Sequence, residues 1–149
     1  MKVSTVVFLN GQAGGPSVQV VSLLRMAHDA VNMQDLELAK TAYTRAIFVA
    51  RTTDDFIGIV QHAGARNFHQ SAKDALFAAK GHTQDVNLLL RLANIGAQAG
   101  YIPQTTDIYQ SAIAASSNFY QLNVIAQHAE HNHYPETARQ ARLKAISLA

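Results

Sequence analysis

Apolar residues return along this chain every 33 residues, and from residue 17 onward their register does not slip. Large side chains recur in two columns, and alanine recurs in a third. A period of this length is typical of stacked supersecondary units, each of which buries its apolar face only against its neighbours. The columns are Leu23, Phe56, Leu89 and Leu122; Met26, Ile59, Leu92 and Ile125; and Ala46, Ala79, Ala112 and Ala145.

Each period holds two helical patterns. In the first period, Leu23, Met26, Ala27 and Ala30 fall at i, i+3, i+4 and i+7, which is the apolar stripe of an amphipathic helix. Short connections make successive helices antiparallel neighbours. The sequence therefore predicts an all-α fold of about four antiparallel helix pairs. The expected helices span residues 17–33, 35–50, 54–66, 69–80, 84–99, 103–116, 119–131 and 135–148.

Polar and special residues mark the expected helix ends. Thr53 precedes two aspartates, so we expect it to cap the third helix and to place two acids in its first turn. Pro103 and Pro135 suit the first turn of a helix, where a missing N–H costs little. Gly100 follows a helical pattern and suits a C-terminal cap.

Composition excludes several classes of protein. The chain of 149 residues contains no cysteine, so disulfides, thiol catalysis and thiolate metal sites are absent. Its formal net charge is only +2, and basic and acidic residues are scattered, whereas a nucleic-acid binder gathers Lys and Arg on one face. No apolar run approaches the ~20 residues that span a membrane. We expect no membrane span and no nucleic-acid partner.

Residues 1–16 lie outside the period, and we interpret them as a leader or tail that precedes a single repeat domain over residues 17–149. Residues 3–9 are apolar enough for a short strand. The glycine-rich stretch that follows lacks the lysine of a phosphate-binding loop and does not fit GxGxxG. We expect a cytoplasmic protein without a cofactor; the alternative is export, with residues 1–15 as a weak signal peptide.

The columns of residues 17–149 resemble tetratricopeptide repeats (TPR). In that family, the first helix carries a large apolar, a Leu-like and a small residue at fixed offsets, and the second carries a small residue, an aromatic and an alanine. The chain has no tryptophan to begin a first helix, which departs from the family pattern. The resemblance implies a right-handed α-solenoid whose first helices line a concave face and bind extended peptides or partner helices. The matching residues are Leu89, Leu92 and Ala93, and Ala39, Tyr43 and Ala46.

One polar column follows the small core residue of each first helix, and it consists of His28, Gln61, Asn94 and Gln127. Amide side chains offer two donors and an acceptor, so a ladder of them can pair with the backbone of an extended peptide. The alternative is an ordinary solvated face.

Further candidate binding residues lie beside this column. Arg25 and Arg91 are placed one turn earlier, where their guanidinium groups can match carboxylates on a partner. Asn87 and Tyr120 form a neighbouring row. The sequence predicts that a protein or peptide partner contacts these residues.

Histidines near the C-terminus are the best metal candidate, because His128 and His131 share a helix face and His133 follows. However, His128 holds the same repeat position as His62 and Ile95, which predicts packing between helices and no metal site. No nucleophile elbow, paired-carboxylate motif or HExxH is present, so we expect no catalytic residues.

The main functional hypothesis is a non-catalytic adaptor or scaffold that binds a protein or peptide. The alternative is a structural protein that self-associates into a homo-oligomer through an end of the array. Arg142 occupies the slot of Tyr43, Leu76 and Tyr109, and this polar residue predicts the place where the stack ends. An enzyme or a metal-binding protein with an unrecognised site is the third hypothesis.

Overall fold

A computed structural model describes residues 15–149, and this part of the chain is entirely α-helical, with no strand. Each helix end lies within two residues of the position expected from the sequence. The apolar segment 3–9, the possible signal peptide and most of the glycine-rich stretch lie outside the described residues. The helices are α1 (Val18–Asn32), α2 (Leu36–Val49), α3 (Thr53–Ala65), α4 (His69–Lys80), α5 (Val86–Ala99), α6 (Ile102–Ala115), α7 (Phe119–His131) and α8 (Pro135–Leu148).

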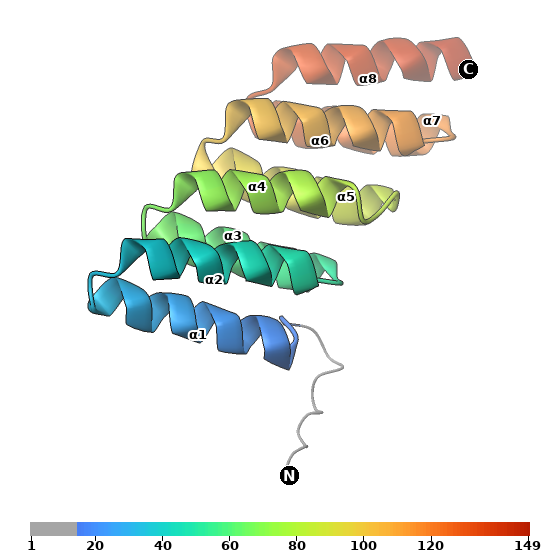
Figure 1. Ribbon diagram of the computed structural model, residues 1–149. Coiled ribbons are helices and arrows are strands. Elements are labelled where there is room, and N and C mark those ends of the chain that lie inside the picture. The colour runs from blue at the N-terminus through green and yellow to red at the C-terminus, as the bar shows by residue number, and fades with distance from the viewer. Residues whose placement is uncertain (1–14) are drawn as a thin grey trace. The chain divides into compact units, whose positions relative to one another are not determined.

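The chain divides into two compact units, residues 1–78 and 79–149, and the division falls within α4. In the N-terminal unit, α1 packs along α2, and α3 contacts both (Figure 1). In the C-terminal unit, α5 pairs with α6 and α7 pairs with α8, while α6 also contacts α7 and α8. Within each unit, adjacent helices therefore pair as the sequence predicts, and this arrangement is compatible with a helical repeat.

Small side chains occupy the contacts inside each helix pair. Ala27 of α1 and Ala46 of α2 are both buried, as are Ala93 of α5 and Ala112 of α6. Two helices can approach closely only where their facing side chains are small, and a larger residue there typically costs 1–3 kcal/mol. The alanine column of the sequence is thus a requirement of packing in both units.

The turns that connect the two helices of each pair share one backbone conformation. Gln34, Asn67, Gly100 and His133 all have a positive φ, of 63°, 67°, 80° and 68°. The residue after each of them donates its N–H to a carbonyl of the preceding helix, as in Phe68 N to Ala63 O at 2.8 Å. This is the hydrogen bond of a Schellman-type helix end. The expected cap at Gly100 is confirmed.

The start of α3 corrects one prediction. Thr52, and not Thr53, is the N-cap, because the Thr52 side chain accepts from the backbone N–H of Asp55, and the Asp55 carboxylate accepts from the Thr52 N–H in return. Pro135 begins α8 and Pro103 lies in the first turn of α6, as expected.

Asp55 also ties three segments of the N-terminal unit together. Its buried carboxylate accepts hydrogen bonds from the backbone N–H of Ser17, at 2.6 Å, and of Arg51, at 2.8 Å. Ser17 is the N-cap of α1, and Arg51 lies in the turn between α2 and α3. One carboxylate therefore fixes the start of α1 and the start of α3 relative to each other.

The helix α1 departs from the expected core pattern. Met26 is 57% exposed, whereas Ile59 and Ile125, its equivalents in α3 and α7, are fully buried. The core of α1 is formed by Val20, Leu24 and Ala27, the side that meets α2 and α3. Within the described residues no helix precedes α1, so no helix covers the side that carries Met26.

We expect Gly100→Ala to lower the free energy of unfolding by about 1–2 kcal/mol, because only the left-handed backbone, and no steric clash, opposes a side chain there. Chemical denaturation would measure the change. Gln98→Ala, at an exposed position of the same helix end, is the control and should change stability by less than about 0.5 kcal/mol. Equal stability of Gly100→Ala and the native chain would contradict the role of the turn.

We expect Asp55→Ala to cost about 3–5 kcal/mol, since several backbone N–H groups lose a charged acceptor in a buried place. Asp74→Ala is the matched control, because that exposed carboxylate accepts a hydrogen bond from the Gln70 amide one turn away on the same helix. Thermal and denaturant unfolding would compare the two. A loss at Asp55 no greater than the loss at Asp74 would show that the buried carboxylate does not hold the unit together.

Candidate functional site

The N-terminal unit has a hollow of about 480 Å³ between α1 and α3. Two of the predicted binding residues, Arg25 and His28, line it, and both are exposed. Gln61 is exposed on α3 but does not line the hollow. The remaining lining residues are Val21, Leu24, Asp29, His62 and Arg66.

Arg66, at the C-terminal end of α3, organises the basic side of this hollow. Its Nη1 donates to the carbonyl of His62 at 3.1 Å, and its Nη2 lies 3.2 Å from Nδ1 of His28. A guanidinium group is a donor only, so Nδ1 of His28 accepts this hydrogen bond. Arg66 was not predicted as a site residue from the sequence, because the equivalent positions of the other repeats hold other residue types.

A buried tyrosine and a histidine meet at the contact between α2 and α3. The Tyr43 hydroxyl lies 2.7 Å from Nδ1 of His62, and burial raises the pKa of Tyr43. The pKa of His62 falls from 6.5 to about 4, first because burial penalises the charged ring and then because Arg66 and His28 repel it. His62 is therefore neutral at pH 7.

The same pair recurs in the C-terminal unit, where the Tyr109 hydroxyl lies 2.8 Å from Nδ1 of His128. Asn132 donates to the same hydroxyl at 3.0 Å, and burial lowers the pKa of His128. His128 thus packs between helices, as its repeat position predicts. Within the described residues, no three His, Cys, Asp or Glu side chains gather as a metal would require, and that includes His128, His131 and His133.

The predicted residues of the C-terminal unit fall in two groups. Asn87 and Tyr120 line a hollow of about 450 Å³ at the N-terminal ends of α5 and α7. Arg91, Asn94 and Gln127 do not line it. Arg91 and Gln127 are exposed, and Asn94 is half-buried.

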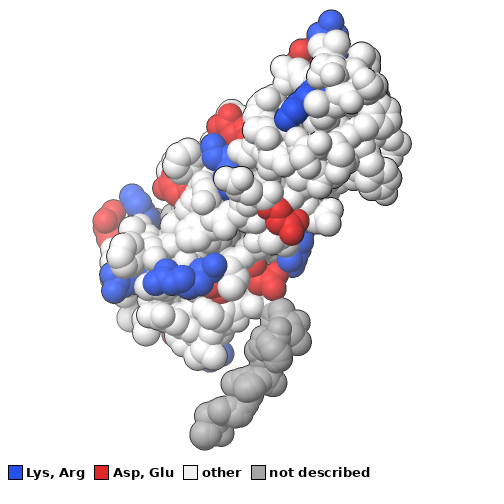
Figure 2. Space-filling view, turned by 90° about the vertical axis from the view of Figure 1, so that its right-hand side faces the viewer, with Lys and Arg blue, Asp and Glu red and all other residues white. Residues whose placement is uncertain are grey.

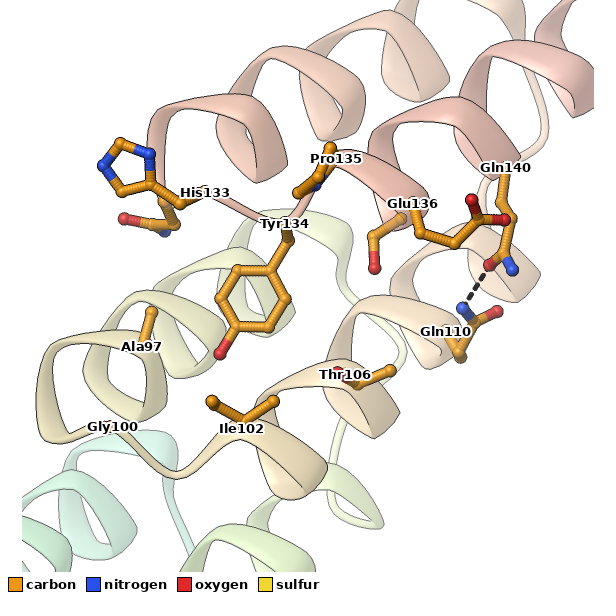
Figure 3. A pocket seen from close by; sticks show the side chains of 12 residues that line it. Ala97, Gly100, Ile102, Thr106, Gln110, His133, Tyr134, Pro135, Glu136 and Gln140 are labelled. Carbon is orange, nitrogen blue, oxygen red and sulfur yellow. Dashed lines mark hydrogen bonds between the residues drawn. The ribbon is translucent and has the colours of Figure 1, made fainter.

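A third hollow, of about 470 Å³, was not predicted from the sequence (Figure 3). It lies in the C-terminal unit between α6, the start of α8 and the turn before α8. Ile102 and Tyr134 supply apolar lining, and the Gln110 amide donates to the Gln140 side chain at one side. Many of its residues come from helix starts and from the turn before α8, where the sequence indicated only helix ends.

Charged side chains of both signs are interspersed on the face shown in Figure 2. The local basic excess near the C-terminus is largely engaged within the protein. Arg142 forms two hydrogen bonds with Glu130, at 2.7 and 2.8 Å, which lower the pKa of that carboxyl. The Lys144 ammonium donates to the carbonyls of Ile113 and Ser116 at the end of α6.

None of the helices between residues 15 and 149 is long and apolar enough to cross a membrane. No protein-family profile matches the chain, and no curated protein matches it significantly.

We expect the free energy of unfolding to decline as pH falls from about 6.5 to about 4. In this range His62 binds a proton in the unfolded chain but stays neutral in the folded state, where its pKa is lower. Partial exposure limits this loss to about 1–2 kcal/mol. His62→Gln should flatten the decline, and His128 contributes the remainder with the same sign. Melting temperatures between pH 4 and 7 would measure it; an identical pH profile for His62→Gln would contradict the assignment.

Proposed function

We propose that this protein is a non-catalytic adaptor that binds a protein or peptide segment through the exposed faces of its first helices, α1, α3, α5 and α7. One observation carries the proposal: the predicted polar residues lie on the outer side of these helices, next to a buried apolar stripe. His28, Gln61 and Gln127 are exposed, whereas the residues directly before them, Ala27, Val60 and Ala126, are buried.

The chemistry of these faces suits an extended peptide. Gln61, Asn94 and Gln127 present amide donors and acceptors, which can pair with a peptide backbone. In the N-terminal unit, Arg25 makes no ion pair within the described residues, so its guanidinium is available to a carboxylate on the partner. In the C-terminal unit, Asn87 and Tyr120 offer a half-polar hollow for a side chain.

The TPR resemblance supports the same proposal, since that family binds peptides with its first helices. A right-handed solenoid with a strict 33-residue period, the absence of a cofactor and a cytoplasmic location stay predictions from the sequence. Repeat folds serve many unrelated roles, so the chemistry of the partner has to come from experiment.

The test begins with affinity capture from the native cell, followed by titration of the captured partner. We expect Arg25→Ala with Gln61→Ala, and separately Arg91→Ala with Asn94→Ala, to weaken binding about tenfold or more, because each removes hydrogen bonds worth roughly 1 kcal/mol or more.

The control variants are Lys40→Ala and Arg139→Ala, exposed cations on the second helices α2 and α8. They should bind like the native chain. Far-ultraviolet circular dichroism confirms that each variant remains helical. Native affinity in both double variants, with helicity intact, would overturn the proposed binding faces.

A further inference from the structure

Two apolar positions that are buried on other helices are exposed on α1 and on α8. On α1, Met26 is 57% exposed, while its equivalents Ile59 and Ile125 are fully buried. On α8, Ile146 is 68% exposed, while Ile113, its equivalent in α6, is 8% exposed. The buried equivalents lie on α3, α6 and α7, which are helices of the α2–α3 contact in one unit and of the α6–α7 contact in the other. The exposed side of α8 therefore corresponds to the side of α6 that packs on α7. The exposed side of α1 corresponds to the sides of α3 and α7 that pack on α2 and α6.

The polar residues of these two faces are complementary in charge. Inside the array, the contact places Tyr43 against His62 in one unit and Tyr109 against His128 in the other. Arg142 holds the tyrosine position on α8, and Asp29 holds the histidine position on α1. A contact of the same register between α8 and a following α1 would thus bring a guanidinium group against a carboxylate.

Both groups are able to make this pair. Asp29 is exposed and has no ion-pair partner within the described residues. Arg142 already binds Glu130 through Nη1 and Nη2, but a guanidinium group has five N–H donors, so donors remain for a second carboxylate. The described residues just before α1 are held elsewhere, since the backbone N–H groups of Gly15 and Ser17 donate to Asp54 and Asp55 at the start of α3.

We propose that the outer face of α8 (Arg142 and Ile146) docks on the outer face of α1 (Met26 and Asp29) of a second copy of this chain. The contact repeats the α6–α7 packing between molecules, with Arg142 paired to Asp29 and both apolar side chains covered. It joins two different surfaces, so association continues from copy to copy unless a ring closes. This inference goes beyond partner binding and does not depend on it.

Sedimentation velocity and light scattering of the full chain over a range of concentration test the proposal. We expect the native protein to form species larger than a dimer as concentration rises. Met26→Glu and Ile146→Glu should each be monomeric, because each blocks one of the two faces with a buried charge. An equimolar mixture should form a 1:1 dimer of twice the 16.2 kDa chain mass that does not grow further, since each copy retains one working face.

Charge reversal gives an independent test of the register. Asp29→Arg and Arg142→Asp should each associate at least tenfold more weakly than the native chain, and their mixture should recover the association. Glu130→Gln and Leu36→Glu are controls, because the first frees Arg142 and the second adds a charge on an exposed site of α2. Both should associate at least as well as the native chain.

A native chain that stays monomeric at millimolar concentration overturns the proposal. So does association that survives both Met26→Glu and Ile146→Glu, or a mixture of the reversed-charge variants that remains monomeric. Loss of association in only one of the two glutamate variants would indicate a symmetric contact of a single face, which also contradicts the head-to-tail arrangement.

Discussion

The close approach of paired helices is the constraint on which each unit depends. Alanine at positions such as 46 and 112 is fully buried, and it allows a second helix to lie directly against its partner. Small side chains at the contact leave the larger residues on its flanks to fill the core, as Tyr43 does in α2 and Leu122 does in α7. One additional methylene there would overpack the contact and push the helices apart.

Two tyrosine–histidine pairs are buried at contacts between helices. The two Tyr–His pairs give each buried hydroxyl a partner, and burial keeps each imidazole neutral. Asp55 does the same for backbone N–H groups at the start of α3. These interactions select which helix faces meet, since a slip by one residue would leave the buried polar groups unsatisfied. Specificity within each unit therefore comes from a few polar contacts set in an otherwise alanine-rich interface.

Much of the helical layout could be predicted, because periodicity and capping are local properties of the chain. The position of His128 between helices was also predicted, since His128 shares its repeat position with His62 and Ile95. Arg66 and the hollow beside Tyr134 could not be predicted, because their neighbours come from different helices and their residue types do not repeat. Met26 was misplaced in the core for a related reason: its column is buried elsewhere only because another helix lies before it.

The sequence by itself determined the helices within residues 17–149, their ends to within two residues and most of their apolar stripes, since each depends on residues one or two turns apart. It also determined that residues such as Gln61 and Gln127 point away from an apolar stripe. Only the tertiary structure decided which equivalent positions are covered, where the hollows form and how the pKa of His62 is lowered. Those properties depend on the distance between groups on separate helices, and a repeated pattern does not say which of its positions another helix covers.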